Sequence, residues 1–212
     1  MDMYKLIKNK DMEEITQLLM NNPSLANEGI PFDDEHPTLA HPLHRICDAV
    51  HAGSITDEQA VEMAKVFLMH GADVHGGVKE DGKDSPLVAA ASLYADQVGI
   101  LLVNNGADIH HAGCHGGTAL HWAGWCGRPV LLERLIEEGA SINRLCRDFV
   151  STPLFWTIHG YRSGERKNAT GYLACVKMLL DAGADKSIPN VEGYTVYDML
   201  EAEDVAFREI LD

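Results

Sequence analysis

The sequence has few basic residues for its length, and this shortage limits what the protein can bind. Its 17 lysines and arginines are outnumbered by 32 aspartates and glutamates, which gives a formal net charge of −15. Such an acidic excess repels phosphate backbones and anionic lipid headgroups, so we expect no nucleic-acid or membrane partner. A basic protein partner fits the charge, and so does the simpler interpretation that the charge only maintains solubility.

Paired cysteines and long apolar segments are also missing. Five cysteines cannot all pair within one chain, and none lies in a Cys-x-x-Cys motif, which favours a reducing compartment. No stretch reaches the length that spans a bilayer, and residues 1–5 lack the apolar run of a signal peptide. We therefore predict a cytoplasmic protein.

The motifs of common catalytic sites are absent as well. The chain contains no Gly-x-Ser-x-Gly elbow and no Gly-x-x-x-x-Gly-Lys phosphate loop. We predict that it is not an enzyme and needs no cofactor. One cluster suggests an alternative, a metal or small-molecule site within residues 110–126, although its spacing matches no standard zinc motif. The cluster consists of His110, His111, Cys114, His115, His121 and Cys126.

Two short strings recur along the chain at a fixed spacing. The first string opens a helix, at residues 41–44, 85–88, 118–121, 152–155 and, in degenerate form, 195–198. The second is Gly-Ala-Asp or Gly-Ala-Ser and closes a helix, at residues 71–73, 106–108, 139–141 and 183–185. From Pro86 to Ala119, and again from Gly106 to Gly139, the period is 33 residues. A period of this kind indicates a repeat protein.

One repeat is a short helix, a tight loop and a longer helix. Thr118 can cap the first helix with its hydroxyl, and Gly139 ends the second, where a left-handed backbone is needed. A unit this small cannot bury its apolar face alone, so stacking predicts a curved all-α solenoid. The predicted core is Leu43, Leu87, Leu120 and Leu154 of the first helices, with Val66, Phe67, Leu68, Leu101, Leu102, Leu135, Ile136, Met178, Leu179 and Leu180 of the second.

These residues resemble the ankyrin repeat family. Residues 118–123, Thr-Ala-Leu-His-Trp-Ala, are close to that family's Thr-Pro-Leu-His-x-Ala, and the closers recur at matching offsets. The resemblance covers roughly residues 36–200. It implies antiparallel helix pairs, projecting β-hairpin fingers and a concave binding face made of the fingers and first helices. It implies no catalytic residues.

The organisation that we expect is a single domain over residues 1–212. A helical N-terminal cap and an acidic loop occupy residues 1–35, and about five repeats open near 41, 85, 118, 152 and 195, with a helical C-terminal cap. Repeats one and four carry about ten extra residues, near 50–58 and 161–170, within or after the first helix. Such insertions are either part of a binding face or tolerated surface loops.

The contact positions that the resemblance implies define a candidate interface. Aromatic residues and arginine at such positions are typical binding hot spots, although bulky side chains there can also just pack on the next repeat. The predicted partner-binding residues are Asp84, Leu93, His115, Trp125, Phe149, His159, Tyr161, Arg162 and Tyr194. We expect Trp122 and Trp156 to be half-buried packing residues.

The function that these patterns favour is a non-catalytic protein–protein interaction module. It would bind a protein partner through its concave face as a monomer, either as an inhibitor or immunity-type protein or as an adaptor or effector. The alternative is the metal- or small-molecule-binding protein built on residues 110–126. A purely structural spacer fits less well, because it would not need aromatic side chains in the groove.

Overall fold

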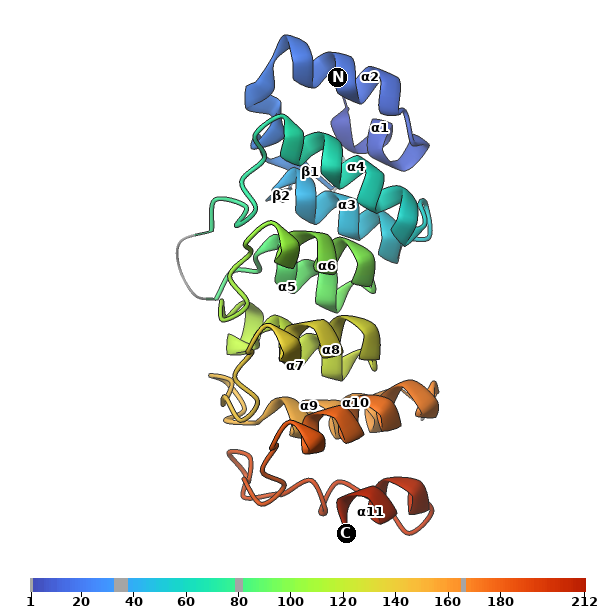
Figure 1. Cartoon of the computed structure of the whole chain (residues 1–212), viewed down its shortest axis with the longest axis vertical. Coiled ribbons are helices and arrows are strands. Elements are labelled where there is room, and N and C mark those ends of the chain that lie inside the picture. Colours follow the sequence, from blue (N-terminus) through green and yellow to red (C-terminus); the bar gives the residue numbers. More distant parts are fainter. Residues whose placement is uncertain (1, 33–37, 79–81, 165–166) are drawn as a thin grey trace. The chain divides into compact units, whose positions relative to one another are not determined.

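The computed structural model describes residues 2–32, 38–78, 82–164 and 167–212 (Figure 1). The described residues fall into two compact units, one within residues 1–80 and 84–108, the other within residues 81–83 and 109–212. Among them, no helix combines the length and the apolar character that a membrane crossing requires. The single curved solenoid over the whole chain stays a prediction.

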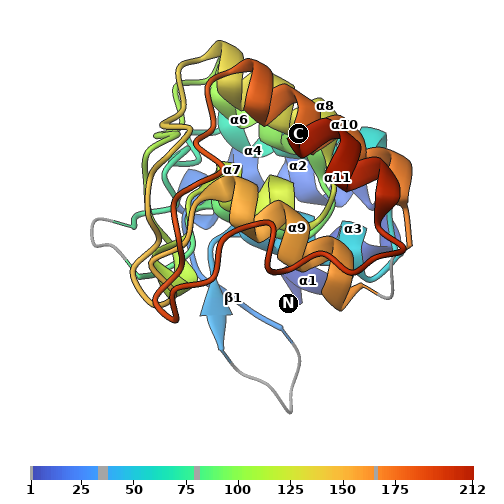
Figure 2. The ribbon, with the colours of Figure 1, turned by 90° about the horizontal axis from the view of Figure 1, so that it is seen from below.

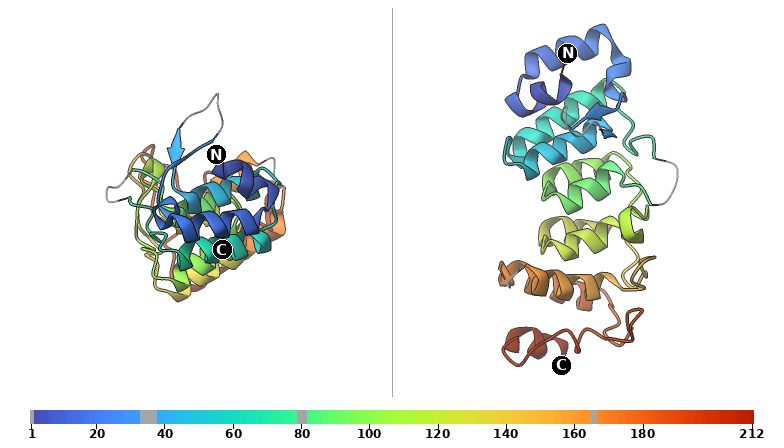
Figure 3. Two further views of the ribbon diagram at one scale, coloured as in Figure 1. Left: turned by 90° about the horizontal axis from the view of Figure 1, so that it is seen from above. Right: turned by 180° about the vertical axis from the view of Figure 1, so that it is seen from behind.

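In the described part of the first unit, helices follow one another in pairs. The first member of each pair packs on the first member of the next, and the second members do the same, so that each unit has two layers (Figure 3). The elements are α1 (Met3–Asn9), α2 (Met12–Asn21), the 3₁₀ helix η1 (Pro23–Ala26), β1 (Ile30–Pro31), β2 (Leu39–Ala40), α3 (Pro42–His51), α4 (Asp57–Met69), α5 (Pro86–Ser92) and α6 (Asp96–Asn104).

The second unit continues the same construction. Helices α7 and α9 lie in one layer, and α8 and α10 lie in the other, with α11 packed on α10 (Figure 2). Its elements are the 3₁₀ helix η2 (Cys114–Gly116), α7 (Ala119–Trp125), α8 (Pro129–Glu137), α9 (Pro153–Ser163), α10 (Ala169–Asp181) and α11 (Val205–Leu211).

Four of the five predicted openers begin a helix where expected. Helices α3, α5, α7 and α9 start directly after their cap residues; Ser85 Oγ, for example, accepts the Val88 amide at 3.3 Å. The four closing glycines have φ between +84° and +91°, the left-handed conformation that a helix end requires. The fifth opener is different. Both the amide and the hydroxyl of Thr195 donate to Asp198 Oδ2 at 2.7 Å, which makes a turn rather than a helix.

The helix pair α1–α2, predicted as a cap, is joined to the next pair as repeats are joined to one another. The Asn27 side chain donates to the Gly71 carbonyl at 2.8 Å and accepts the Asp73 amide at 2.6 Å. Asn143 makes the same two bonds, at 3.0 and 2.8 Å, to the closer at residues 183–185. The N-terminal pair therefore has the inter-repeat bonds of a true repeat.

The extra residues of repeats one and four lengthen helices rather than forming only loops. Helices α3 and α4 have 10 and 13 residues, and α9 and α10 have 11 and 13. The regular repeats have 7 and 9 residues at the same places. The inserted residues are thus divided between helix ends and the turns that join the two helices. Glu165 and Arg166 of the second insertion lie outside the described residues.

Among the residues that the structure describes, the predicted fingers form strands where β1 pairs with β2 and nowhere else, with Ile30 opposite Ala40 and Pro31 opposite Leu39. Residues 33–37 of the expected acidic loop lie outside the described residues. In the second unit the described fingers are turns, and neighbouring fingers are hydrogen-bonded to each other. The Arg147 amide donates to the His115 carbonyl at 3.2 Å, and the Val191 amide donates to the Phe149 carbonyl at 2.9 Å.

The predicted core is buried throughout the first helices and in part in the second helices. The opener leucines of α3, α5, α7 and α9 are at most 1% exposed. Of the second-helix residues, four are fully buried, Phe67, Leu102, Leu135 and Leu179. The remaining six are half-buried, Val66, Leu68, Leu101, Ile136, Met178 and Leu180.

Candidate functional site

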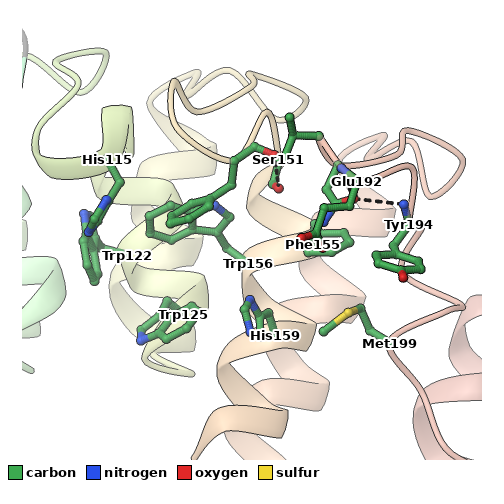
Figure 4. A pocket seen from close by; sticks show the side chains of 13 residues that line it. His115, Trp122, Trp125, Ser151, Phe155, Trp156, His159, Glu192, Tyr194 and Met199 are labelled. Carbon is green, nitrogen blue, oxygen red and sulfur yellow. Dashed lines mark hydrogen bonds between the residues drawn. The ribbon is translucent and has the colours of Figure 1, made fainter.

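A pocket of about 570 Å³ lies in the second unit, between the first helices and the fingers (Figure 4). It is mostly apolar, and the three tryptophans of the chain all line it. Its lining residues are His115, Trp122, Trp125, Phe149, Ser151, Phe155, Trp156, His159, Asn190, Val191, Glu192, Tyr194 and Met199. A volume of this size is within the range of ligand-binding pockets.

Two consecutive first helices supply the inner wall. Trp122 and Trp125 are three residues apart on α7, and Trp156 and His159 are three apart on α9, so each pair shares one helix face. In Figure 4 Trp122 and Trp125 lie on one side, Trp156 and His159 lie in the middle, and Tyr194 and Met199 close the other side.

Trp156 is the centre of a network of edge-to-face aromatic contacts. Its ring centroid lies 5.1 Å from Trp122 at an interplanar angle of 85° and 5.8 Å from Trp125 at 70°. Phe149 approaches from the finger at 6.2 Å and 60°. Trp156 itself is 4% exposed. Because such pairs favour one mutual orientation, the walls of the pocket are preorganised.

The two helices can approach closely because α9 has a glycine where they meet. A Cβ atom on Gly160 would lie 2.1 Å from the Trp125 carbonyl oxygen, far inside contact distance. The same carbonyl accepts a hydrogen bond from the Tyr172 hydroxyl at 2.8 Å. This approach places the indole of Trp125 against that of Trp156.

The finger that carries Phe149 has an unusual backbone. Val150 adopts φ +49°, a conformation that β-branched residues rarely take. The position lies two residues before the cap residue, where Gly116 and Gly193 of the neighbouring fingers have φ +71° and +87°. The Ser151 hydroxyl holds the turn by donating to the Phe149 carbonyl at 3.0 Å. Strain of this kind often accompanies functional sites.

The described residues that line the pocket are acidic or neutral. Glu192 is the one acidic lining residue among those described, and no lysine or arginine is among them. Burial, with a smaller effect of the nearby Arg162 charge, lowers the pKa of His159, so its imidazole is neutral near pH 7. His115 Nδ1 lies 3.1 Å from Asp148 Oδ2. Hydrogen bonds from Arg147 and His115 lower the pKa of Asp148, which therefore stays ionised.

Five of the nine predicted partner-binding residues line this pocket, namely His115, Trp125, Phe149, His159 and Tyr194. Asp84 and Leu93 belong to the first unit, where both are half-buried. Trp122 is half-buried, as expected, whereas Trp156 is buried more deeply than expected, and both also line the pocket. Each tryptophan lies four residues after the cap residue of its helix, and this shared position was the sequence signal that could have placed both in the pocket.

Tyr161 and Arg162, which were also predicted to bind a partner, make contacts within the second unit and do not line the pocket. Tyr161 is 7% exposed, because its ring packs on Phe207 with centroids 4.2 Å apart and its hydroxyl donates to Asp204 at 3.3 Å. The Arg162 guanidinium donates to the Met199 carbonyl and to the Glu201 carboxylate. Both side chains fasten α9 to the segment that follows α10.

The histidines and cysteines of residues 110–126 do not converge. Among the described residues, no group of three or more His, Cys, Asp or Glu side chains is placed to hold a metal ion. His111 Nε2 lies 2.7 Å from the Lys83 carbonyl, and Cys114 is exposed while Cys126 is buried. Only His115 of this cluster lines the pocket.

His121 is a structural residue at the start of α7. Its Nδ1 accepts the Thr118 amide at 3.1 Å, and its Nε2 faces the carbonyls of Arg144 and Ser151 at 3.1 and 3.3 Å. Carbonyls only accept hydrogen bonds, so Nε2 carries the proton and the ring is neutral. Burial lowers its pKa to about 4. Both ring nitrogens are therefore occupied.

Comparison with known proteins gives one family and several partial relatives. Residues 50–146 match the family model of ankyrin repeats, in three copies, which confirms the predicted resemblance there. Palmitoyltransferase ZDHHC13 of Mus musculus is 33% identical over 141 residues, which are 61% of this chain and 21% of that protein. Palmitoyltransferase Hip14 of Drosophila melanogaster is 30% identical over 92 residues, 43% of this chain and 13% of that protein. Palmitoyltransferase ZDHHC17 of Danio rerio is 34% identical over 92 residues, with the same shares.

Proposed function

Residues 50–146 of this chain are ankyrin repeats, and we propose that the protein is a non-catalytic interaction module that binds a protein partner through the pocket of its second unit. Repeat arrays of this kind present extended binding surfaces to other macromolecules. The observation that carries the proposal is that all three tryptophans line one pocket. Tryptophan and tyrosine are the residues in which binding energy concentrates at protein interfaces.

The exposure of the lining residues supports binding rather than simple packing. Tyr194 and Phe149 are 51% and 45% exposed at the mouth, whereas Phe155 and Trp156 inside are 3% and 4% exposed. A partner that covers the mouth would bury large apolar area on a floor that is already ordered. Preorganised walls reduce the entropy that binding costs, so such a site favours affinity.

The polar groups of the pocket support a non-catalytic role. The Ser151 hydroxyl donates to the Phe149 carbonyl, and His115 faces the Asp148 carboxylate, so neither takes part in a nucleophile–base pair with the other. The named relatives are palmitoyltransferases, but the matched segments span only 13% to 21% of their length. We infer that the likeness to those segments does not bring the transfer activity to this chain.

Two roles fit a binding module of this size. An inhibitor or immunity-type protein would cover a functional surface of its partner, and an adaptor or effector would join two proteins. Both roles are compatible with a cytoplasmic monomer that has a basic partner, as the net charge of −15 favours. Identification of the captured partner separates the two.

The test is affinity capture with two matched variants. Tyr194→Ala removes a mouth residue that is 51% exposed, and Tyr94→Ala removes a tyrosine of the first unit that is 43% exposed. We expect the specific partner to be lost with Tyr194→Ala and with Trp125→Ala but retained with Tyr94→Ala, while all three variants keep a cooperative unfolding transition. Equal capture by all variants would remove the pocket from the interface.

A further inference from the structure

The pocket combines aromatic ring faces with a single carboxylate. Six phenylalanine, tyrosine and tryptophan side chains line it, together with Glu192, and the described lining contains no lysine or arginine. The faces of aromatic rings carry negative partial charge and attract cations. Because the rings meet at steep angles, 85° for Trp122–Trp156 and 78° for Trp125–His159, they present faces in several directions.

The nearby cationic groups do not neutralise this surface. The lowered pKa of His159 leaves its ring uncharged near pH 7. The Arg162 guanidinium is bonded to the Met199 carbonyl and to Glu201, and it also lies 3.7 Å from Asp204. Arg147 Nε donates to Asp148 at 2.8 Å. A cation that enters the pocket therefore meets an electrostatically complementary site in a chain of net charge −15.

The first unit of the same chain already holds an arginine in this way. The Arg45 guanidinium lies 5.8 Å from the Tyr4 ring centroid and 5.4 Å from that of Phe32. It is also paired with the Asp48 carboxylate at 2.5 Å, and Nε donates to the Ile30 carbonyl at 2.9 Å. Two aromatic rings, one carboxylate and the carbonyls of Ile30 and Thr38 together hold a guanidinium that is 5% exposed.

We infer that the pocket accommodates an arginine side chain of the protein partner, with ring faces of the tryptophans around the guanidinium and Glu192 as its anion. This inference rests on the proposed function and names the chemistry of its partner. Arginine fits better than lysine because its planar group stacks on aromatic faces and is less strongly hydrated, so an apolar pocket desolvates it more easily. A carboxylate can pair with it through two hydrogen bonds. The volume of about 570 Å³ leaves room for residues that flank the arginine.

The experiment uses the tryptophans as reporters of the pocket. Since all three line it, intrinsic fluorescence and the indole N–H signals in NMR spectra respond to ligands there. The probes are Nα-acetyl-arginine-N-methylamide and its neutral isostere Nα-acetyl-citrulline-N-methylamide, with the lysine and norleucine analogues alongside. We expect saturable changes with the arginine probe at millimolar concentration, and about five- to tenfold weaker binding of the citrulline probe.

A charge-removing variant and its control locate the anion. Glu192→Gln should weaken the arginine probe about three- to tenfold and leave the citrulline probe unchanged. Glu133→Gln removes the same charge from an exposed residue of α8 that does not line the pocket, and it should change neither. An equal effect of both variants would mean that only overall charge matters, which contradicts the inference.

Three results would overturn the arginine assignment. They are equal binding of the citrulline and arginine probes, tighter binding of the lysine probe, and no saturable change with the arginine probe. The capture experiment with Tyr194→Ala distinguishes failure of the arginine assignment from failure of the proposed protein-binding function. If capture depends on Tyr194 but the probes do not distinguish charge, the pocket is an interface for another kind of side chain. If capture is independent of Tyr194, the proposed function itself is wrong.

Discussion

The two units carry different side chains at the same two helical positions. Counted from the cap residue of each first helix, the fourth and seventh positions of the first unit are occupied by Arg45 with Asp48 and by Ala89 with Ser92. In the second unit they are occupied by Trp122 with Trp125 and by Trp156 with His159. The second position after the cap is leucine in all four helices and is buried in each. The repeat therefore fixes the core position and leaves the fourth and seventh positions free to vary.

In the first unit the polar side chains at these positions bond within the chain, whereas in the second unit the side chains at these positions line a pocket. The Arg45 guanidinium forms an ion pair with the Asp48 carboxylate, and the Ser92 hydroxyl donates to the Ala89 carbonyl at 3.2 Å. The tryptophans instead build the walls of a pocket of about 570 Å³. The proposed binding site thus differs from the same positions of the first unit in its side chains, while the pairing of helices is the same.

The largest effect should follow from separating α7 and α9. In Gly160→Ala the new methyl would overlap the Trp125 carbonyl oxygen, so we expect the free energy of unfolding of the second unit to fall by about 3–4 kcal/mol. Denaturant unfolding followed by tryptophan fluorescence measures this. Gly164→Ala at the end of the same helix is the control and should cost less than about 1 kcal/mol. Similar losses of stability in both variants would show that the close packing of Gly160 on the Trp125 carbonyl does not stabilise the second unit.

Acid should destabilise the second unit through His121. Its folded pKa of about 4 lies below the unfolded value of 6.5, so between these pH values the unfolded chain binds more protons and stability falls as pH falls. The expected loss is about 3 kcal/mol from pH 6.5 to pH 4. His121→Gln should be less stable at pH 7 but should lose less on acidification. An unchanged pH slope in that variant would assign the acid sensitivity to other groups.

Removing the Arg45–Asp48 ion pair should lower the stability of the first unit alone. Arg45→Leu removes the guanidinium from the Asp48 carboxylate, whose side chain is 13% exposed, and leaves only the His44 imidazole at 3.9 Å beside it. Because some solvent reaches Asp48, we expect a loss of about 2 kcal/mol rather than the larger cost of a fully buried ion. The double variant Arg45→Leu with Asp48→Leu should recover part of the loss. Far-UV circular dichroism follows the unfolding, and unchanged tryptophan fluorescence of the native state would confirm that the pocket is unaffected.

The smallest effect should come from the finger of Phe149. Val150→Gly replaces a β-branched residue at φ +49° with the residue that the neighbouring fingers use there, so we expect stability to rise by about 1 kcal/mol. Val191→Gly in the next finger has no such strain to relieve and should be neutral or destabilising. Thermal unfolding measures both. A destabilised Val150→Gly would mean that the valine side chain contributes more through packing than its backbone costs.

The sequence was sufficient for much of the fold because the relevant signals are local. A cap residue, a proline and a leucine define the start of a helix, and a glycine in the left-handed conformation defines its end, so the openers at 41, 85, 118 and 152 were placed correctly. The degenerate opener at 195 was misleading, because Asp198 captures the amide and hydroxyl of Thr195 in a turn. The N-terminal pair was undervalued because its link, through Asn27, joins residues 44 and 46 positions apart.

The site was predictable only in part. Trp125, Phe149, His159 and Tyr194 could be chosen from their register within the repeat, and they do line one pocket. Tyr161 has a similar sequence context, and yet Phe207 and Asp204, more than 40 residues later, cover it. No local pattern contains that information, because the covering residues lie in α11 and directly before it, far along the chain.

What the sequence determined by itself was the repeating unit: where helices begin and end, which leucines are buried, and how much negative charge the chain carries. The helix ends and the buried leucines depend on hydrogen bonds and apolar spacing within a few residues, and the charge follows from composition alone. Only the tertiary structure decided which aromatic rings meet, that Arg162 is paired internally, and that Trp156 lies at the centre of a pocket. Those outcomes depend on how closely neighbouring helices approach, and a single atom at Gly160 is enough to change it.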